Sequence, residues 1–370
     1  MRAPRTSPRL TPPLCSTKVP RSAVTGALNA PPSVGQRAAR MQLAMPTLAV
    51  TASHVKWTVA HPDLSAFQSL LRACPAPTLS SLLPRLSDLG SRLLAPERDP
   101  QMRLSVLRLL DELMEDPVRG PAFRGPLSGL FLMAVLLPPC VWRAGKVAAA
   151  VRYAAAVSVG TMLERDLIAR EQLVEALAVG ADPSDPKARA KGVPRAGAAH
   201  AALRRPRCRY RQPSTHPQKK GALIAVVTSL MDEDYYTDTR LAAVHVCRHL
   251  IRIVGPALMY EQRRHLYPEL AKRLDDASDV VREAGARTIQ AFVAESGKEL
   301  DETNTGYLVK SILIHMDDAN AAVAEAVCAA VCTAAGIWPA AVRREVEEVM
   351  DRFRSKVMCE RVIRVCQEAC

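Results

Sequence analysis

The chain has 370 residues, of which 50 are Lys or Arg and 37 are Asp or Glu, giving a net charge of +13. Apolar residues make up 48% and aromatic residues 4%. The first value excludes wholesale disorder, and the second argues against a β-sandwich or barrel. The longest candidate for an apolar span, residues 127–137, ends at Pro138 and Pro139. It is too short to cross a bilayer, so we expect no membrane association.

The positive charge is concentrated in two Pro-rich stretches. Residues 1–60 contain eight Lys or Arg and no acid, and residues 185–220 contain eleven against Asp185 alone. We expect a disordered leader over 1–60 and a disordered insertion over 181–220. Because a folded nucleic-acid binder carries its basic patch on its folded surface, we do not expect nucleic-acid binding as the main function. Non-specific binding of RNA or another polyanion through residues 185–220 is one alternative.

The polar residues show no catalytic or metal-binding pattern. His245 and His249 stand four apart, but they lack the Glu after the first His and the third ligand that zinc-protease sites require. The ten cysteines include no Cys-x-x-Cys motif. Two cysteine pairs, Cys328/Cys332 and Cys366/Cys370, are expected to be small core residues. We therefore expect no enzyme activity, no catalytic residue, no metal and no cofactor.

Helical periodicity begins after the leader. Apolar residues predict helices over 79–94, which Pro84 should kink, and over 101–113, 127–137 and 145–163. A further helix is predicted from Glu171, where the sequence EQLVEALAV begins. We expect helix pairs over 61–180, upstream of the insertion.

Three similar segments follow in residues 221–370. Each has an apolar helix, an acidic turn and a second apolar helix that ends near a glycine. The segments cover residues 223–255, 265–297 and 307–336. A spacing of about 40 residues is typical of arrays of paired helices, in which each repeat packs on its neighbours. The sequence therefore predicts an all-α solenoid of antiparallel helix pairs.

The ends of these helices carry further signals. The acidic pairs at 232–233, 275–276 and 317–318 precede the second helices, where carboxylates are expected to cap free N–H groups. Gly255, Gly297 and Gly336 follow the second helices, and we expect left-handed conformations there.

The repeats resemble HEAT repeats. The second segment carries the fullest match, with Pro268, Asp276 and Arg282 at the family's spacing. The resemblance implies that the Pro bends the first helix and that the Asp and Arg join neighbouring repeats in a ladder. Asp234 and Arg240 keep this spacing in the first segment. The third keeps Asp318 but has Ala324 in place of the Arg, and Glu97 and Arg103 form a degraded upstream copy.

Two longer strings resemble the C-terminal half of the HEAT-repeat axonemal dynein arm assembly factors. They are VWRAGKVAAAVRYAAAVS from Val141 and YPELAKRLDDASDVVR from Tyr267. The likeness covers about 62–180 and 221–370. It implies a non-catalytic, cytoplasmic factor for preassembly of dynein arms. Its implied partners are axonemal dynein intermediate and heavy chains and chaperone machinery, and we expect the chain to be a monomer.

The resemblance also implies a partner surface, because paired helices of this type present their second helices to the concave side. The candidate contact residues are His245, His249, Arg252, Arg287 and Gln290. Besides the polyanion binder, the alternative that remains open is a HEAT scaffold of nuclear transport or of a phosphatase.

Overall fold

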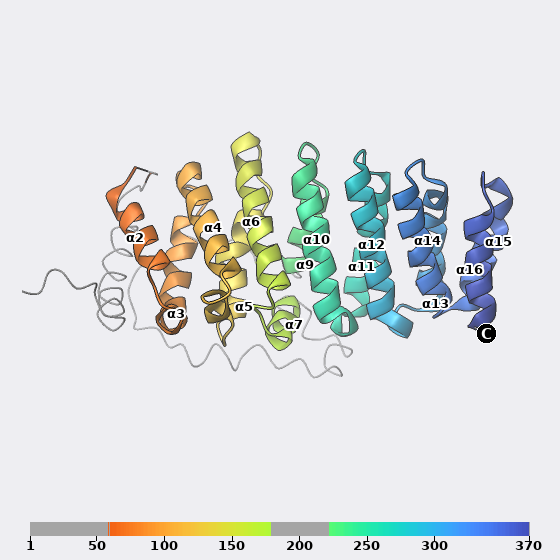
Figure 1. Cartoon of the computed structure of the whole chain (residues 1–370), viewed down its shortest axis with the longest axis horizontal. Coiled ribbons are helices and arrows are strands. Elements are labelled where there is room, and N and C mark those ends of the chain that lie inside the picture. Colours follow the sequence, from red (N-terminus) through yellow and green to blue (C-terminus); the bar gives the residue numbers. More distant parts are fainter. Residues whose placement is uncertain (1–57, 59, 179–221, 370) are drawn as a thin grey trace, which may run out of the picture.

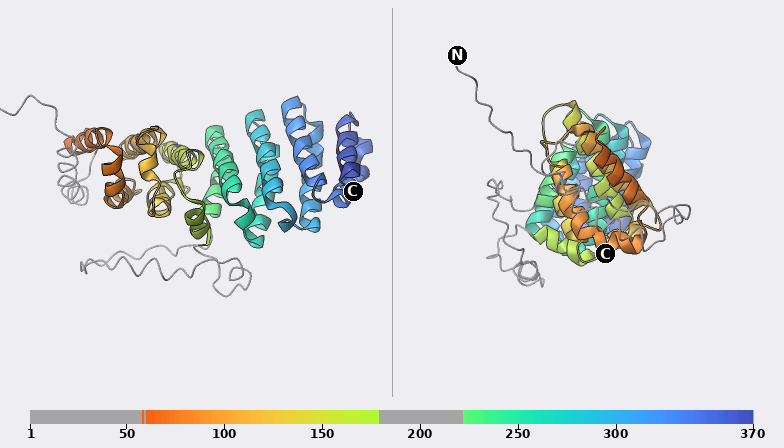
Figure 2. Two further views of the ribbon diagram at one scale, coloured as in Figure 1. Left: turned by 60° about the horizontal axis from the view of Figure 1, so that its bottom comes forward. Right: turned by 90° about the vertical axis from the view of Figure 1, so that its left-hand side faces the viewer.

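The computed structural model describes residues 58, 60–178 and 222–369. The predicted insertion, and almost all of the predicted leader, lie outside these residues. The described residues form helices and turns without a strand. The helices stand side by side in two layers (Figure 1), and their axes turn along the array (Figure 2). The prediction of an all-α solenoid is confirmed.

We name the two layers after the place of their helices in each pair. The first-helix layer contains α3 (Ala76–Leu93), α5 (Ser128–Phe131), α7 (Arg170–Ala178), α9 (Ala222–Met231), α11 (Tyr260–Ala271), α13 (Glu302–Ile312) and α15 (Pro339–Val349). The second-helix layer contains α2 (Pro62–Arg72), α4 (Pro100–Glu115), α6 (Lys146–Glu164), α10 (Thr237–Val254), α12 (Asp279–Ser296), α14 (Ala321–Ala335) and α16 (Val357–Glu368). Turns that lead into the second helices line the upper edge of the array in Figure 1.

Packing between successive second helices holds the array together. α6 packs on α4 and α10, and α12 packs on α10 and α14. In α10 the buried residues recur at three- and four-residue spacing, as in Ala243, Cys247 and Leu250. One apolar cluster runs from Leu64 to Cys366. Since no single helix pair can cover its own apolar face, the repeats stabilise each other by stacking.

Two short helices share one place in the first-helix layer. α7 contacts α5 on one side, α9 contacts α11 on the other, and both contact α10. The side-chain amide of Gln262 in α11 donates to the Leu177 carbonyl at 3.2 Å, which joins the end of α7 to the start of α11. The stretch 179–221 therefore lies between α7 and α9. These two short helices together take the place of one first helix in a single repeat.

Helix α6 is long and apolar enough to cross a membrane by length and composition, contrary to the expectation that no apolar run is long enough. It packs between α4 and α10, and 56% of its apolar window is buried within the protein. Its small residues, such as Ala155 and Ala156, lie fully buried at these contacts. The helix therefore belongs to the packed core of the array.

The ends of several elements differ from the sequence expectations. Gly297 has a φ of +50°, but Gly255 and Gly336 adopt right-handed conformations. Residues 127–137, expected to form one helix, instead contain the short α5 and a π-helical turn over Leu132–Leu136. Gly255 is required for a different reason, because a Cβ there would lie 2.5 Å from the Cβ of Glu295. Close packing of the next helix, and not a left-handed turn, explains this glycine.

Candidate partner surface and inter-repeat ion pairs

Two ion pairs of the same geometry connect successive repeats in the C-terminal half. The Arg240 Nε and Nη2 atoms lie 2.6 and 2.9 Å from the two Asp276 carboxylate oxygens. The Arg282 Nε and Nη2 atoms lie 3.0 and 3.2 Å from those of Asp318. Each Arg is the fourth residue of its helix, and each Asp stands three residues before the next second helix. We call this arrangement a rung.

The carboxylates of the rungs also hold the turns before the helices. Asp276 accepts a hydrogen bond from the Ser278 backbone N–H at 2.9 Å, and Asp318 accepts one from that of Asn320 at 2.7 Å. For Asp276, burial opposes the charge. The hydrogen bonds from Arg240 and Ser278 outweigh it and hold the pKa below its ordinary value.

The expectation that the acidic pairs cap the helices was wrong. The residue at the start of α14 that accepts from helix N–H groups is Asn320, through Ala322 and Val323. The N-cap of α12 is Ser278, whose side chain makes no capping bond. Asp276 and Asp318 face the guanidinium of the preceding repeat instead, because two charge-assisted bonds to Arg are stronger than one bond to a helix end.

A third inter-repeat pair lies out of register with the rungs. Arg152 in α6 pairs with Glu233, and it also donates to the Arg143 carbonyl. Its side chain is 4% exposed and that of Glu233 3%. The sequence does contain one signal of this buried pair, because Arg152 is the only charged residue between Lys146 and Glu164. Its partner could not be read from spacing, since Asp234 occupies the regular position.

The remaining ladder residues take different places. Asp234 is exposed, and its carbonyl, together with that of Glu233, lies against Arg240. Pro268 stands inside α11, which passes into a 3-10 turn over Lys272–Asp275. Ala324 stands where α14 would offer an Arg, and at this end Arg354 instead lies 3.0 Å from Asp317.

The five candidate contact residues come from two adjacent second helices. His245, His249 and Arg252 lie on α10, and Arg287 and Gln290 lie on α12. The two arginines are exposed, while the histidines and Gln290 are half-buried. Arg287 pairs with Glu283 at 2.6 Å, and the Gln290 amide donates to the Thr333 hydroxyl at 3.4 Å. The hydrogen bond between Gln290 and Thr333 therefore links this face of α10 and α12 to α14.

Three arginines, Arg248, Arg252 and Arg287, lie on α10 and α12 at this face. Burial lowers the pKa of Arg248, and the charges of Arg252 and Arg287 act in the same direction, while Glu164 of α6 opposes them. Burial also lowers the pKa of His245 and of His249, so that both are neutral near pH 7. Arginines on neighbouring helices can bind carboxylates or phosphates of a partner.

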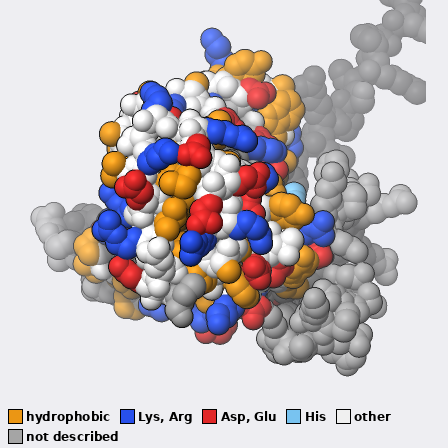
Figure 3. Space-filling model, turned by 90° about the vertical axis from the view of Figure 1, so that its right-hand side faces the viewer, with side chains coloured by type: hydrophobic (Ala, Val, Ile, Leu, Met, Phe, Trp, Pro, Cys, Tyr) orange, Lys and Arg blue, Asp and Glu red, His pale blue; other side chains and the backbone are white. Residues whose placement is uncertain are grey.

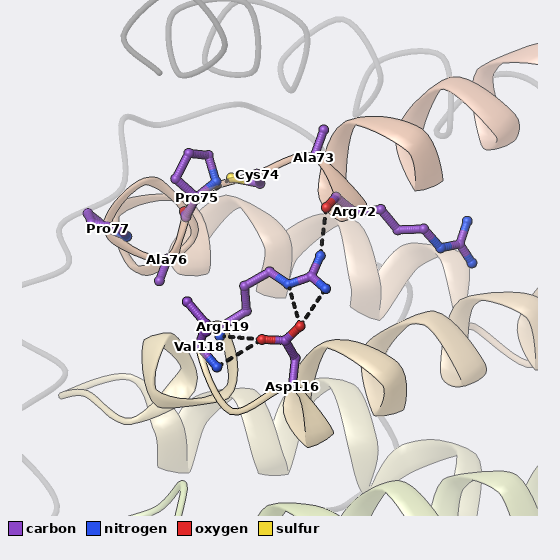
Figure 4. A pocket seen from close by; sticks show the side chains of 9 residues that line it. All are labelled: Arg72, Ala73, Cys74, Pro75, Ala76, Pro77, Asp116, Val118 and Arg119. Atoms are coloured by element: carbon purple, nitrogen blue, oxygen red, sulfur yellow. Dashed lines mark hydrogen bonds and ion pairs between the residues drawn. The ribbon is translucent and has the colours of Figure 1, made fainter. Parts of the chain in front are cut away.

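A shallow pocket of about 440 Å³ lies at the other end of the array (Figure 4). Arg72, Cys74, Asp116, Val118 and Arg119 are among its lining residues. The Arg119 guanidinium bonds to the Asp116 carboxylate at 2.6 Å and to the Arg72 carbonyl at 2.6 Å. Burial raises the pKa of the Cys74 thiol, which makes it a weak nucleophile. The charged groups here satisfy one another.

The rest of the described chain shows no cluster of metal ligands, and its end face at α15 and α16 carries charges of both signs. In residues 60–178 and 222–369, no three His, Cys, Asp or Glu side chains come together in a way that could hold a metal ion. Lys and Arg alternate with Asp and Glu on the end face formed by α15 and α16 (Figure 3). Arg343 and Glu347 form one such surface pair at 2.6 Å.

Comparison with known proteins gives relatives in sequence, while no family model matches. The chain is 26% identical over 325 residues to Dynein axonemal assembly factor 5 of Homo sapiens and of Mus musculus, and 23% identical over 326 residues to that of Xenopus laevis. These matches cover 86% of the chain. The chain spans about a third of the length of these relatives. The resemblance inferred from the sequence strings is confirmed.

Solved structures with a similar outline include an engineered protein and a designed armadillo repeat protein. The engineered protein gives a TM-score of 0.45 at 12% identity and covers 76% of this chain and 96% of its own. The designed armadillo protein gives 0.44 at 16% identity, covering 76% and 98%.

Proposed function

We propose that the chain is a non-catalytic scaffold for the assembly of axonemal dynein arms. The observation that carries this proposal is the sequence similarity to Dynein axonemal assembly factor 5, which runs through 86% of the chain. The proposed site of action is the cytoplasm, where dynein intermediate and heavy chains and chaperone machinery would be the partners.

The architecture supports a role in binding rather than catalysis. An array of stacked helix pairs offers a long surface to an extended partner. In the proposal, the rungs at Arg240 and Arg282 keep successive repeats in register, so that residues on neighbouring helices stay at fixed distances. The proposed partner surface is the face with His245, His249, Arg252, Arg287 and Gln290.

Affinity purification from ciliating cells tests the proposal. The tagged full chain should recover axonemal dynein intermediate and heavy chains, identified by mass spectrometry. Recovery of transport receptors or phosphatase subunits alone would overturn the proposal in favour of another kind of helical scaffold. A chain lacking residues 185–220 should recover the same partners, because the deleted stretch is outside the proposed surface.

Charge reversal separates the proposed surface from the rest of the array. The double variant Arg252→Glu and Arg287→Glu should recover less dynein chain than the parent. Arg364→Glu is the matched control, because Arg364 is an exposed arginine on α16, away from α10 and α12. Equal loss with both variants would point to a general effect of charge and would remove α10 and α12 from the proposal.

A further inference from the structure

Helix α4 carries an arginine at the rung position, and no carboxylate of the described residues pairs with it. Arg103 is the fourth residue of α4, as Arg240 and Arg282 are in their own helices. Its side chain is 6% exposed, and its Nε is buried without a hydrogen-bond partner. Within the described residues no ion pair reaches its guanidinium. The Nε atom of Arg103 has therefore lost contact with water without gaining a hydrogen-bond acceptor.

The position that should supply the carboxylate holds a second cation. Asp276 and Asp318 stand three residues before α12 and α14, whereas Arg143 stands three residues before α6. Helix α4 packs on α6, as α10 packs on α12, so Arg143 occupies the position that faces the Arg103 guanidinium in the pattern of the rungs. Burial lowers the pKa of Arg103, and the positive charge of Arg143 lowers it further. Glu97, on the exposed turn before α4, opposes this effect, but no ion pair joins it to Arg103.

The turn around Arg143 is exposed and partly apolar. In residues 141–147, Val141, Trp142 and Val147 are 48%, 59% and 49% exposed. Residues 138–151 contain Arg143 and Lys146 and no acid. Arg152 donates a hydrogen bond to the Arg143 carbonyl, which holds the turn in place, and it pairs with Glu233, so that this neighbouring carboxylate already has a cation. The turn lies on the upper edge of the array in Figure 1.

The parts of the chain outside the described residues do not match this charge. Residues 1–57 contain no acid, and residues 179–221 contain only Asp182 and Asp185 among eleven Lys or Arg. Neither stretch is therefore rich in carboxylates that could complement the charge of Arg103 and Arg143.

We propose that Arg103 and the turn 141–147 form a docking site for an acidic, extended segment of a partner protein. One Asp or Glu of that segment lies between Arg103 and Arg143 and completes the empty rung, and an apolar neighbour packs on Trp142. Guanidinium groups bind carboxylates through two parallel bonds, as Arg240 does with Asp276. The site does not depend on the dynein assembly role, because it specifies the chemistry of the segment and not its source.

Binding of a synthetic peptide tests the site. The probe is a fluorescein-labelled peptide of alternating Glu and Leu, with a Gln-and-Leu peptide as the neutral control, titrated with the full chain at physiological ionic strength. We expect Arg143→Ala and Arg103→Met each to weaken binding about tenfold or more. The control Arg364→Ala should change it less than about twofold. All variants keep the basic stretch 185–220, so equal binding by all of them would place the peptide there and overturn the proposal.

Stability distinguishes a binding role of Arg103 from a structural one. Because the Arg103 charge is buried without a partner, Arg103→Met should leave the urea midpoint unchanged or raise it. A clear fall in the midpoint would show that Arg103 already has a partner within the fold and would overturn the proposal. If the peptide does not bind at this site, the expected result of the dynein purification does not change, because that experiment tests a different surface.

Discussion

Arg240 and Asp276 face each other across two repeats through two parallel hydrogen bonds of 2.6 and 2.9 Å. Their side chains are 12% and 4% exposed, so water contributes little to either charge. The pair connects the start of α10 to the turn before α12. Its two-point geometry fixes the orientation as well as the distance of the neighbouring repeat.

Removing one partner of this pair should destabilise the array. Arg240→Met leaves the buried Asp276 without its cation, and we expect a loss of about 3 kcal/mol in the free energy of unfolding. Arg343→Met removes an exposed arginine from its pair with Glu347 and should change stability by less than about 1 kcal/mol. Urea denaturation followed by circular dichroism measures both. Similar midpoints for the two variants would contradict a stabilising role of the rung.

Acid titration provides a second test of the same pair. The pKa of Asp276 is depressed in the folded protein, so its contribution is complete above the unfolded pKa of about 3.9 and is lost as the pH falls through the lower folded pKa. The difference in urea midpoint between the parent and Asp276→Asn should therefore be large at neutral pH and shrink below pH about 4. A constant difference across this range would show that the carboxylate charge is not responsible.

The solenoid could be predicted from the sequence because its signals are local and repeated. The glycines at 255, 297 and 336 and the acidic turns recur with the spacing of one helix pair. The register of Arg240 and Arg282 within their helices follows from the same repetition. Such patterns need no knowledge of which side chains meet in space.

The features that sequence could not predict depend on contacts between distant residues. The Arg152–Glu233 pair departs from the register, so spacing pointed to Asp234 instead. The need for glycine at 255 comes from Glu295, forty positions away. The missing carboxylate at Arg103 becomes visible only once α4 and α6 lie side by side. Periodicity identifies the elements, whereas charge pairing and close approach require the packed array.

A methyl group at Gly255 should force the end of α10 away from α12. Gly255 has a φ of −45°, which alanine adopts without strain, so the effect of Gly255→Ala isolates the steric contact with Glu295. We expect a loss of about 1–3 kcal/mol in the free energy of unfolding. Gly125→Ala is the control, because a Cβ there meets nothing within 4 Å. The result to look for is a lower urea midpoint for the first variant alone.

Cys332 should be the most reactive of the seven described cysteines. A hydrogen bond from Cys328 and the charge of Arg361 lower the pKa of its thiol, and its side chain is only half-buried. Burial raises the pKa of the Cys140 and Cys247 thiols to about 12. Because the thiolate is the nucleophile, brief iodoacetamide treatment of the native chain should modify Cys332 first. Peptide mass spectrometry measures the order, and faster labelling of Cys140 or Cys247 would contradict it.

The two histidines of the partner surface should make stability depend on pH just below neutrality. Burial lowers the folded-state pKa of His245 and His249 below the unfolded value of about 6.5. Between these values the unfolded chain binds more protons, so stability is complete above pH about 6.5 and decreases as the pH falls.

The double variant His245→Gln and His249→Gln should flatten this dependence between pH about 7 and 5. It will not abolish it, because burial also lowers the pKa of His315. His265→Gln is the matched control, since His265 is exposed on α11, and it should keep the slope of the parent. Urea midpoints at a series of pH values measure the slopes. A double variant that retains the full slope would contradict the prediction. It would show that protonation of the two histidines costs no more free energy in the folded state than in the unfolded chain, and so does not affect folding.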